Sequence, residues 1–155
     1  MIKILLDIDG VMVTTPSWRS PEFLEDGFLK FNEASVRNLS RLITETNASI
    51  ILTTTHRINY SESEWVTLLG NRGISSVSIS KINDCSSIKD MSDRSTEIEE
   101  WVDRNNEYRY IIIDDDSSIN RLSSNIKSNW VMVKSLIGFD GESYEKAIRI
   151  INSEV

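Results

Sequence analysis

Short apolar runs alternate along the chain with segments in which apolar residues recur at helical spacing. Most of the runs are nearly continuous and rich in isoleucine and valine, as strands buried on both faces of a parallel sheet are. They cover residues 2–6, 48–52, 77–79, 109–113 and 130–133, and serines interrupt the third run. The pattern therefore predicts five strands in a mainly parallel sheet.

The segments between the runs carry signals that begin helices. Asn32 can cap a helix with one apolar face, and Ser61 can form a capping box with Glu64. Further helices are predicted from Asp93, over residues 117–127, and from Glu142. Because strands alternate with helices, we expect a three-layer, Rossmann-like α/β fold with right-handed crossovers.

The composition narrows the class of protein. The 155 residues suit one domain over 1–155, and Cys85 is the only cysteine, as expected in a reducing cytoplasm. No apolar run approaches the ~20 residues of a membrane span, so no membrane partner is expected. A net charge of −7 without a lysine or arginine cluster predicts no strongly basic surface for nonspecific nucleic-acid binding.

Acidic and hydroxyl residues stand directly after three predicted strands. The first strand runs into Asp7 and Asp9, the second into residues 53–57 (TTTHR), and the fourth into residues 114–116 (DDD). Ligands of open α/β sheets bind beyond the carboxyl ends of the strands. We therefore expect these three sets to meet at one edge of the sheet.

The acids among them predict a metal site. Asp7, Asp9, Asp114 and Asp115 would crowd negative charges that raise one another's pKa or require a cation. Mg²⁺ prefers such hard oxygen ligands. Beside a metal, one aspartate can attack a phosphorus atom, and a second, two residues on, can protonate the leaving oxygen and later activate water.

Two further groups suit a phosphoryl substrate. Thr53, with Thr54 beside it, can donate hydrogen bonds to phosphoryl oxygens from the end of the second strand. Arg94, at a predicted helix start, can balance the remaining negative charge. The constellation predicts a phosphoryl-transfer site that binds a phosphorylated substrate.

Four motifs in this order resemble the haloacid dehalogenase (HAD) superfamily of phosphohydrolases. They are LLDIDGV, ILTTT, the region around DRSTEIEEW, and YIIIDDD, and the resemblance covers roughly residues 2–151. It implies that Asp7 is the nucleophile that forms an aspartyl-phosphate. It also implies that Asp9 is the general acid/base, with its backbone carbonyl on Mg²⁺.

The remaining family roles fall on the later motifs. The resemblance implies that Thr53 binds phosphate and that Asp114, with Asp115, binds the metal. The third motif usually carries lysine, and this chain offers Arg94 at the helix start, with Lys89 in an earlier loop as the second choice. Arginine keeps the charge but replaces a point charge by a planar fork.

A finer resemblance concerns the stretches DGFLKFN, LTTTHR, and EIEEW before IIIDDD. Together they are similar to small HAD domains associated with Swiss-army-knife RNA-repair proteins. That similarity implies a nucleic-acid end phosphate as the substrate.

The chain leaves little room for the cap domain with which HAD enzymes usually select substrates. Residues 11–31 suit a flap loop, and residues 56–92 hold only what the core requires, so we expect a minimal or absent cap and an open site. In the flap, Trp18 can stack on a base and Arg19 can meet a phosphate, although we favour packing of Trp18 onto the core. Arg57, at the predicted site edge, is either a substrate-phosphate ligand or part of a surface salt bridge.

Other polar residues receive structural interpretations. His56, the only histidine, is interpreted as structural, because the family mechanism does not need one. Cys85 lies in a polar loop without a predicted role. Ser117 and Ser118 are predicted to cap the helix after the fourth strand.

These patterns favour a Mg²⁺-dependent phosphatase that hydrolyses a phosphate monoester. The alternatives are a phosphatase of small metabolites and a non-catalytic HAD-like binding or regulatory module, in which loss of Asp7 or Asp9 would be expected. A receiver domain is disfavoured, because the second strand ends in Thr53 and not in an aspartate. A metal-dependent nuclease is disfavoured by the lack of a basic surface.

Overall fold

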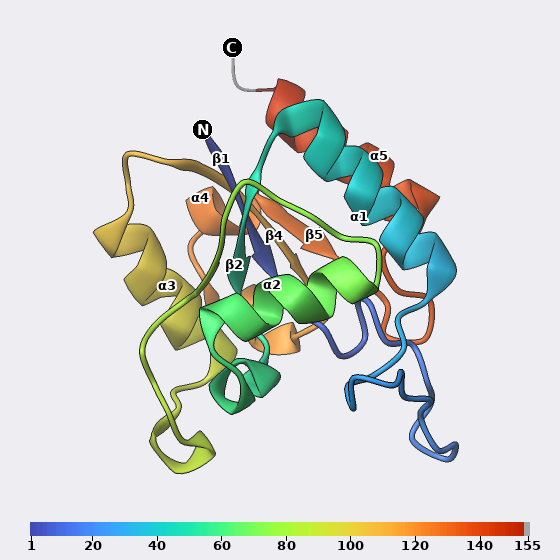
Figure 1. Ribbon diagram of the computed structural model, residues 1–155. Helices are drawn as coiled ribbons and strands as arrows, with labels where there is room; N and C mark the ends of the chain where they lie inside the picture. The colour runs from blue at the N-terminus through green and yellow to red at the C-terminus, as the bar shows by residue number, and fades with distance from the viewer. Residues whose placement is uncertain (154–155) are drawn as a thin grey trace.

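Five parallel strands form the central sheet in the computed structural model, which describes residues 1–153 (Figure 1). Their order across the sheet is β3-β2-β1-β4-β5. The strands are β1 (Ile2–Leu6), β2 (Ser49–Leu52), β3 (Ile79–Lys81), β4 (Arg109–Asp114) and β5 (Trp130–Met132). The predicted α/β fold with a five-stranded parallel sheet is confirmed.

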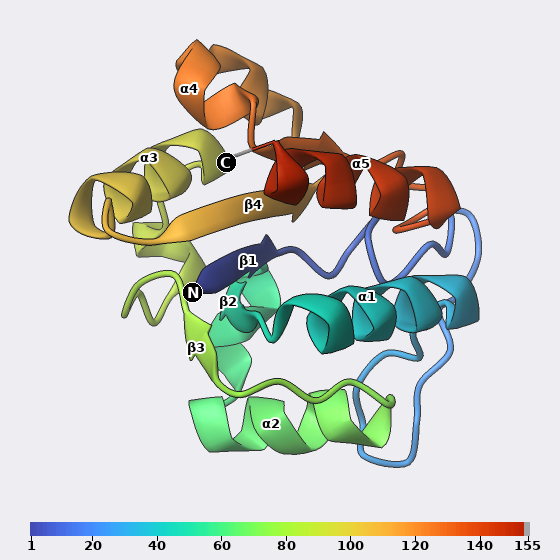
Figure 2. The same cartoon turned by 90° about the horizontal axis from the view of Figure 1, so that it is seen from above.

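Helices cover both faces of this sheet (Figure 2). The α-helices are α1 (Glu33–Thr46), α2 (Glu62–Asn71), α3 (Arg94–Arg104), α4 (Ser124–Lys127) and α5 (Gly141–Asn152). Single 3-10 turns are η1 (Thr55–Asn59), η2 (Ile88–Asp90) and η3 (Ser117–Arg121). Helices α1, α2 and α5 lie on one face, and α3 and α4 lie on the other, which gives three layers.

Successive side chains along each strand point to opposite faces of the sheet, and they contribute to two apolar cores. In β1, Ile4 and Leu6 join the core under α1, α2 and α5, whereas Leu5 joins the core under α3 and α4. All three side chains are fully buried. Burial on both faces explains why the strands are continuous apolar runs in the sequence.

The predicted helix starts are largely confirmed. Asn32 caps α1 by accepting from the Ser35 N–H, the Ser61–Glu64 capping box begins α2, and Asp93 caps α3. Capping by Ser117 or Ser118 was a wrong expectation, because Asp116 accepts from the Ser118 N–H at the start of η3. The predicted single helix over 117–127 is also interrupted, and forms η3 and α4.

Residues 11–31 form the flap, which contains no helix over its fully described length. A short antiparallel bridge joins Phe23 to Leu29, and the Asp26 carboxylate accepts two hydrogen bonds from Arg72 at the end of α2, at 2.6 and 2.8 Å. Arg72 Nε also donates to the Leu29 carbonyl at 2.7 Å. The later half of the flap is therefore fastened to the core.

Candidate active site

Two neighbouring central strands bring the acidic motifs together. Asp7 directly follows β1, Asp114 is the last residue of β4, and these strands pair in parallel with Leu6 opposite Ile113. Carboxylate oxygens of Asp7, Asp114 and Asp115 all lie within 4.8 Å of one another. The convergence predicted at the carboxyl edge of the sheet therefore occurs for the first and fourth motifs.

Gly10, within the first motif, allows this close approach. It has a φ of +81°, a conformation that residues with a side chain rarely adopt. A Cβ atom at Gly10 would lie 2.1 Å from Asp115 Oδ2. The glycine thus lets the chain leave the site without displacing an acidic side chain.

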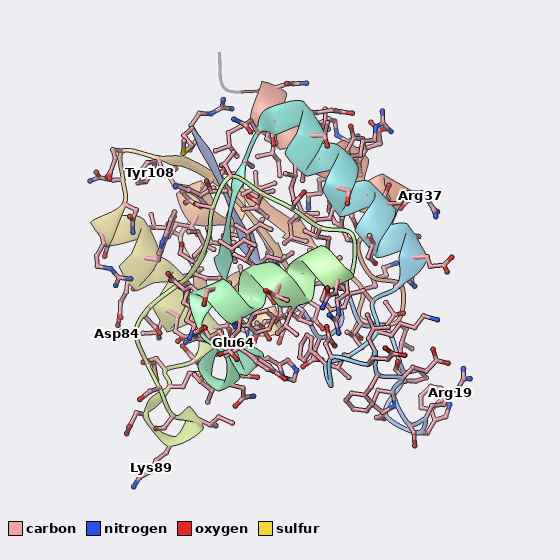
Figure 3. The ribbon with its side chains drawn as sticks, in the orientation of Figure 1. Arg19, Arg37, Glu64, Asp84, Lys89 and Tyr108 are labelled. Carbon is pink, nitrogen blue, oxygen red and sulfur yellow. The ribbon has the colours of Figure 1, made fainter. Side chains whose placement is uncertain are left out.

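Arg94 supplies the cation that faces these acids. It is the first residue of α3, and its Nη1 lies 2.5 Å from Asp114 Oδ2 and 3.5 Å from Asp7 Oδ2. Lys89 instead projects from the tip of the loop around η2, away from the body of the molecule (Figure 3). Of the two residues considered for the basic motif, the fold brings Arg94 to the acids.

Burial and mutual repulsion set the ionisation of the site. Burial raises the pKa of Asp7 to about 6, although the Arg94 charge opposes the shift. Burial and the nearby Asp7 charge raise the pKa of Asp114 to about 7, and burial also raises the pKa of Asp115. Burial alone would lower the pKa of Arg94, but the charges of Asp7 and Asp114 outweigh it and raise that pKa. One guanidinium does not balance three carboxylates, so the site favours a further cation or protons.

Thr53 presents a hydroxyl that is unused within the fold. The residue directly follows β2 and is fully buried, and its N–H donates to the Leu6 carbonyl at 3.0 Å. Its Oγ1 is buried without a hydrogen-bond partner among the described residues. Buried hydroxyls are nearly always satisfied, so this atom suggests a ligand oxygen. The Thr54 hydroxyl oxygen, in contrast, accepts from the His56 N–H at 3.2 Å as the cap of η1.

The only histidine contacts the second acid of the first motif. His56 Nε2 lies 2.9 Å from Asp9 Oδ2, and the Phe28 ring packs edge-on against the imidazole with centroids 5.3 Å apart. This hydrogen bond raises the pKa of His56. The structural interpretation of His56 missed this contact, because residues 9 and 56 show no relation in the sequence.

Arg57 requires a correction. The sequence placed it at the site edge, as a substrate ligand or a surface ion pair, but its side chain is fully buried. The guanidinium pairs with Glu97 of α3 and donates to the carbonyls of Thr53 and Thr54. Turn η1 directs this side chain inward, so it faces the protein interior and not a substrate.

The flap side chains proposed for substrate contact lie outside the core. Trp18 is 77% exposed, so the favoured expectation that it packs the flap onto the core was wrong. Arg19 lies at the far end of the flap (Figure 3) and lines a hollow of about 350 Å³ with Lys30 and Glu22. These residues are accessible to a large ligand but do not touch the acidic cluster.

Comparison with known proteins gives one family match. The family described as "HAD domain in Swiss Army Knife RNA repair proteins" matches residues 3–144, which is most of the chain. No curated protein matches. In the described part of the chain, no helix is both long and apolar enough to cross a membrane.

Proposed function

Because the chain belongs to the family of HAD domains found in Swiss Army Knife RNA repair proteins, we propose that it is a Mg²⁺-dependent phosphatase acting on the terminal phosphate of a nucleic acid. The family itself indicates a phosphohydrolase-type activity. The observation that carries the proposal is the meeting of Asp7, Asp114 and Asp115 with Arg94 at the carboxyl edge of the sheet.

The residues present fit a magnesium ion. Carboxylate oxygens of Asp7, Asp114 and Asp115 can converge on one cation, and their number exceeds the charge that Arg94 supplies. The Asp9 backbone carbonyl is the fourth proposed ligand. When bound, Mg²⁺ would neutralise these carboxylates and polarise a phosphoryl oxygen.

In the first chemical step, Asp7 acts as the nucleophile. One of its carboxylate oxygens bonds to phosphorus while the bond from phosphorus to the ester oxygen breaks. Asp9 gives its proton to that leaving oxygen, which departs as an alcohol. The side chain of Asp9 suits this task because it is largely exposed and can reach a leaving group outside the buried cluster.

In the second step, Asp9 acts as the base. It takes a proton from water, whose oxygen attacks phosphorus and breaks the bond to Asp7. Inorganic phosphate leaves, and Asp7 and Asp9 return to their starting states. Thr53 Oγ1 and the Arg94 guanidinium are the proposed donors to the phosphoryl oxygens, where negative charge must be held throughout.

The flap supports a large substrate. Residues 11–31 form no cap domain, and the exposed Trp18 and the cation Arg19 suit stacking on a terminal base and contact with a neighbouring phosphate. Because the overall charge is −7, we propose recognition of the chain end rather than extended backbone binding.

The first test is phosphate release by the purified protein. We expect turnover of an aryl phosphate with added Mg²⁺ and none after chelation. Asp7→Asn should abolish turnover, and Asp9→Asn should lower kcat by roughly 10²–10⁴-fold. Asp116→Asn is the matched control, because it removes a neighbouring acid while keeping a residue that caps η3 well. Turnover by folded Asp7→Asn, or full activity under chelation, would contradict the mechanism.

The substrate class needs a separate comparison. Oligonucleotides carrying a 5′- or 3′-phosphate, ribose 5-phosphate and a phosphopeptide are assayed beside an uncut, unphosphorylated oligonucleotide. We expect the highest kcat/KM with an end-phosphorylated oligonucleotide and no strand cleavage. A preference for the sugar phosphate would instead favour a metabolite phosphatase.

A further inference from the structure

A buried arginine joins three parts of the chain next to the acidic cluster. Arg57 Nη1 donates to the carbonyls of Thr53 at 3.0 Å and Thr54 at 3.1 Å. Its Nη2 donates to Asn83 Oδ1 at 3.0 Å and to the Glu97 carboxylate. Arg57 therefore connects the end of β2, the loop after β3, and helix α3.

Each end of this connection carries a residue of the proposed site. Thr53 holds the unused hydroxyl that we assign to a phosphoryl oxygen. Glu97 lies one turn after Arg94 on α3, and it also accepts from Asn83 Nδ2 at 2.9 Å. The distance between the phosphate-binding end of β2 and the helix that presents Arg94 thus depends on the Arg57–Glu97 pair.

Stability alone does not account for this pair. Burying a charged pair is costly, and replacing it by apolar residues of similar size is often neutral or stabilising. Arg57 and Glu97 are 0% and 2% exposed, and Arg57 Nε has no hydrogen-bond partner among the described residues. A buried ion pair that leaves one donor without a partner among the described residues and lies beside the proposed site suggests that the role of the pair is to fix the geometry of that site.

We propose that Arg57 is a positioning residue of the active site. It holds the backbone of Thr53 and the first turns of α3 in a fixed relation, so that the Thr53 hydroxyl and the Arg94 guanidinium meet the same phosphoryl group. Arg57 does not touch the substrate. The proposal rests on the phosphatase function proposed above, and it adds to that site a residue that does not contact the reacting atoms.

The decisive variants are Arg57→Met and the double variant Arg57→Met/Glu97→Met. The single variant leaves Glu97 charged and buried, so both the melting temperature and kcat should fall, with kcat lowered on the order of 10²-fold. The double variant removes both charges and should recover the melting temperature. Because it lacks the connection to the carbonyls, it should not recover kcat. Arg57→Lys keeps the charge with fewer donors and should recover part of kcat.

Ile98→Val provides the matched control. Ile98 neighbours Glu97 on α3 and is fully buried, and the change removes one methylene without breaking a hydrogen bond. It should lower the melting temperature and leave kcat of the folded protein unchanged. Recovery of kcat together with stability in the double variant would overturn the positioning role, as would an equal loss of kcat in Ile98→Val.

A readout without turnover separates the two proposals. Inorganic phosphate, added with Mg²⁺, should raise the melting temperature of the wild-type protein and raise it less in the Arg57→Met/Glu97→Met variant. If the wild-type protein binds phosphate but hydrolyses no ester, the phosphatase proposal fails and the positioning role is judged on phosphate binding. Equal phosphate binding by wild type and double variant would overturn the positioning role even if the wild-type protein is an active phosphatase.

Discussion

At the scale of single residues, the site depends on contacts between groups that lie far apart in the sequence. Asp9 and His56 illustrate this, because their side chains are 2.9 Å apart although 47 positions separate them in the sequence. If Asp9 donates the proton to the leaving oxygen, a partner that fixes its carboxyl group should matter most when the leaving group is poor.

His56→Leu tests that dependence. It removes the hydrogen bond that fixes the Asp9 carboxyl group, a contact typically worth about 0.5–1.5 kcal/mol, and we expect a loss of up to roughly tenfold in kcat. The loss should be larger for phenyl phosphate than for p-nitrophenyl phosphate, whose oxygen leaves without help. His56→Gln retains an N–H donor and should recover part of the rate. Equal losses with both substrates would exclude a role through Asp9.

At the scale of elements, short sequence patterns predicted the features that form through contacts between neighbouring residues. The caps at Asn32, Ser61 and Asp93 were predictable because each satisfies N–H groups within its own first turn. The meeting of Asp7 and Asp114 at one edge of the sheet was predictable because both residues stand at the ends of apolar strands. Both kinds of inference need only a few neighbouring residues.

Features that depend on contacts across the fold were not predictable in this way. The third strand was predicted at 77–79 but lies at Ile79–Lys81, where pairing with β2 decides its register. The inward direction of Arg57 follows from η1 and from Glu97, which is 40 positions away. Sequence spacing cannot reveal such a partner, so Arg57 was expected to be either a substrate-phosphate ligand or part of a surface salt bridge.

The flap shows how one element combines a fastened and an exposed half. Arg72 is almost fully buried and stacks against Phe28 and Phe31, while Trp18 in the other half is exposed. Because the fastened half holds the flap in place, the exposed half can present side chains at low entropic cost.

Asp26→Asn tests whether the hydrogen bonds between Arg72 and Asp26 hold the flap to the core. Hydrogen bonds from Arg72 hold the pKa of Asp26 well below its usual range, so the ionised form stabilises the fold. This stability is present above about pH 4, the pKa of an aspartate in an unfolded chain, and is lost as the pH falls through the lower folded pKa. At pH 7 the variant should therefore unfold more easily, by about 1.5–3 kcal/mol. In urea titrations the difference from wild type should shrink below pH 4, and a constant difference down to pH 2 would contradict the explanation.

Trp18→Ala tests the exposed half. Stacking of a base on an aromatic ring contributes about 1–3 kcal/mol, so KM for an end-phosphorylated oligonucleotide should rise roughly fivefold to a hundredfold. The same variant should hydrolyse an aryl phosphate at the wild-type rate, which provides the internal control. Unchanged KM for the oligonucleotide would remove Trp18 from the binding surface.

At the scale of the whole molecule, the acidic cluster should link the proposed metal binding to folding stability. Burial raises the pKa of Asp7 to about 6 and that of Asp114 to about 7, so the folded protein binds more protons than the unfolded chain between pH 4 and pH 7. Without metal, the contribution of these two carboxyl groups to stability is fully present below pH 4 and is lost as the pH rises through these values.

Magnesium should reverse this trend. Because a metal binds the deprotonated carboxylates, Mg²⁺ should raise the melting temperature more at pH 8 than at pH 5. At a concentration of 100 times its Kd it should add about 2.7 kcal/mol. Asp114→Asn should lose the pH-dependent gain, which can be measured by thermal denaturation with Mg²⁺ or a chelator. An equal gain at both pH values would indicate binding elsewhere.

The strand order also determines when the site can exist during folding. Asp7 follows β1 and Asp114 ends β4, so more than 100 residues of chain separate two side chains that must meet. Pairing of strands so distant in sequence is slow, because loop-closure entropy is lost before the contact is gained. A growing chain that has completed only β1, β2 and β3 already carries Asp7 and Thr53 but lacks the opposing acids. The proposed activity therefore requires β4 to insert beside β1, so recovery of activity should lag behind recovery of helix signal on refolding.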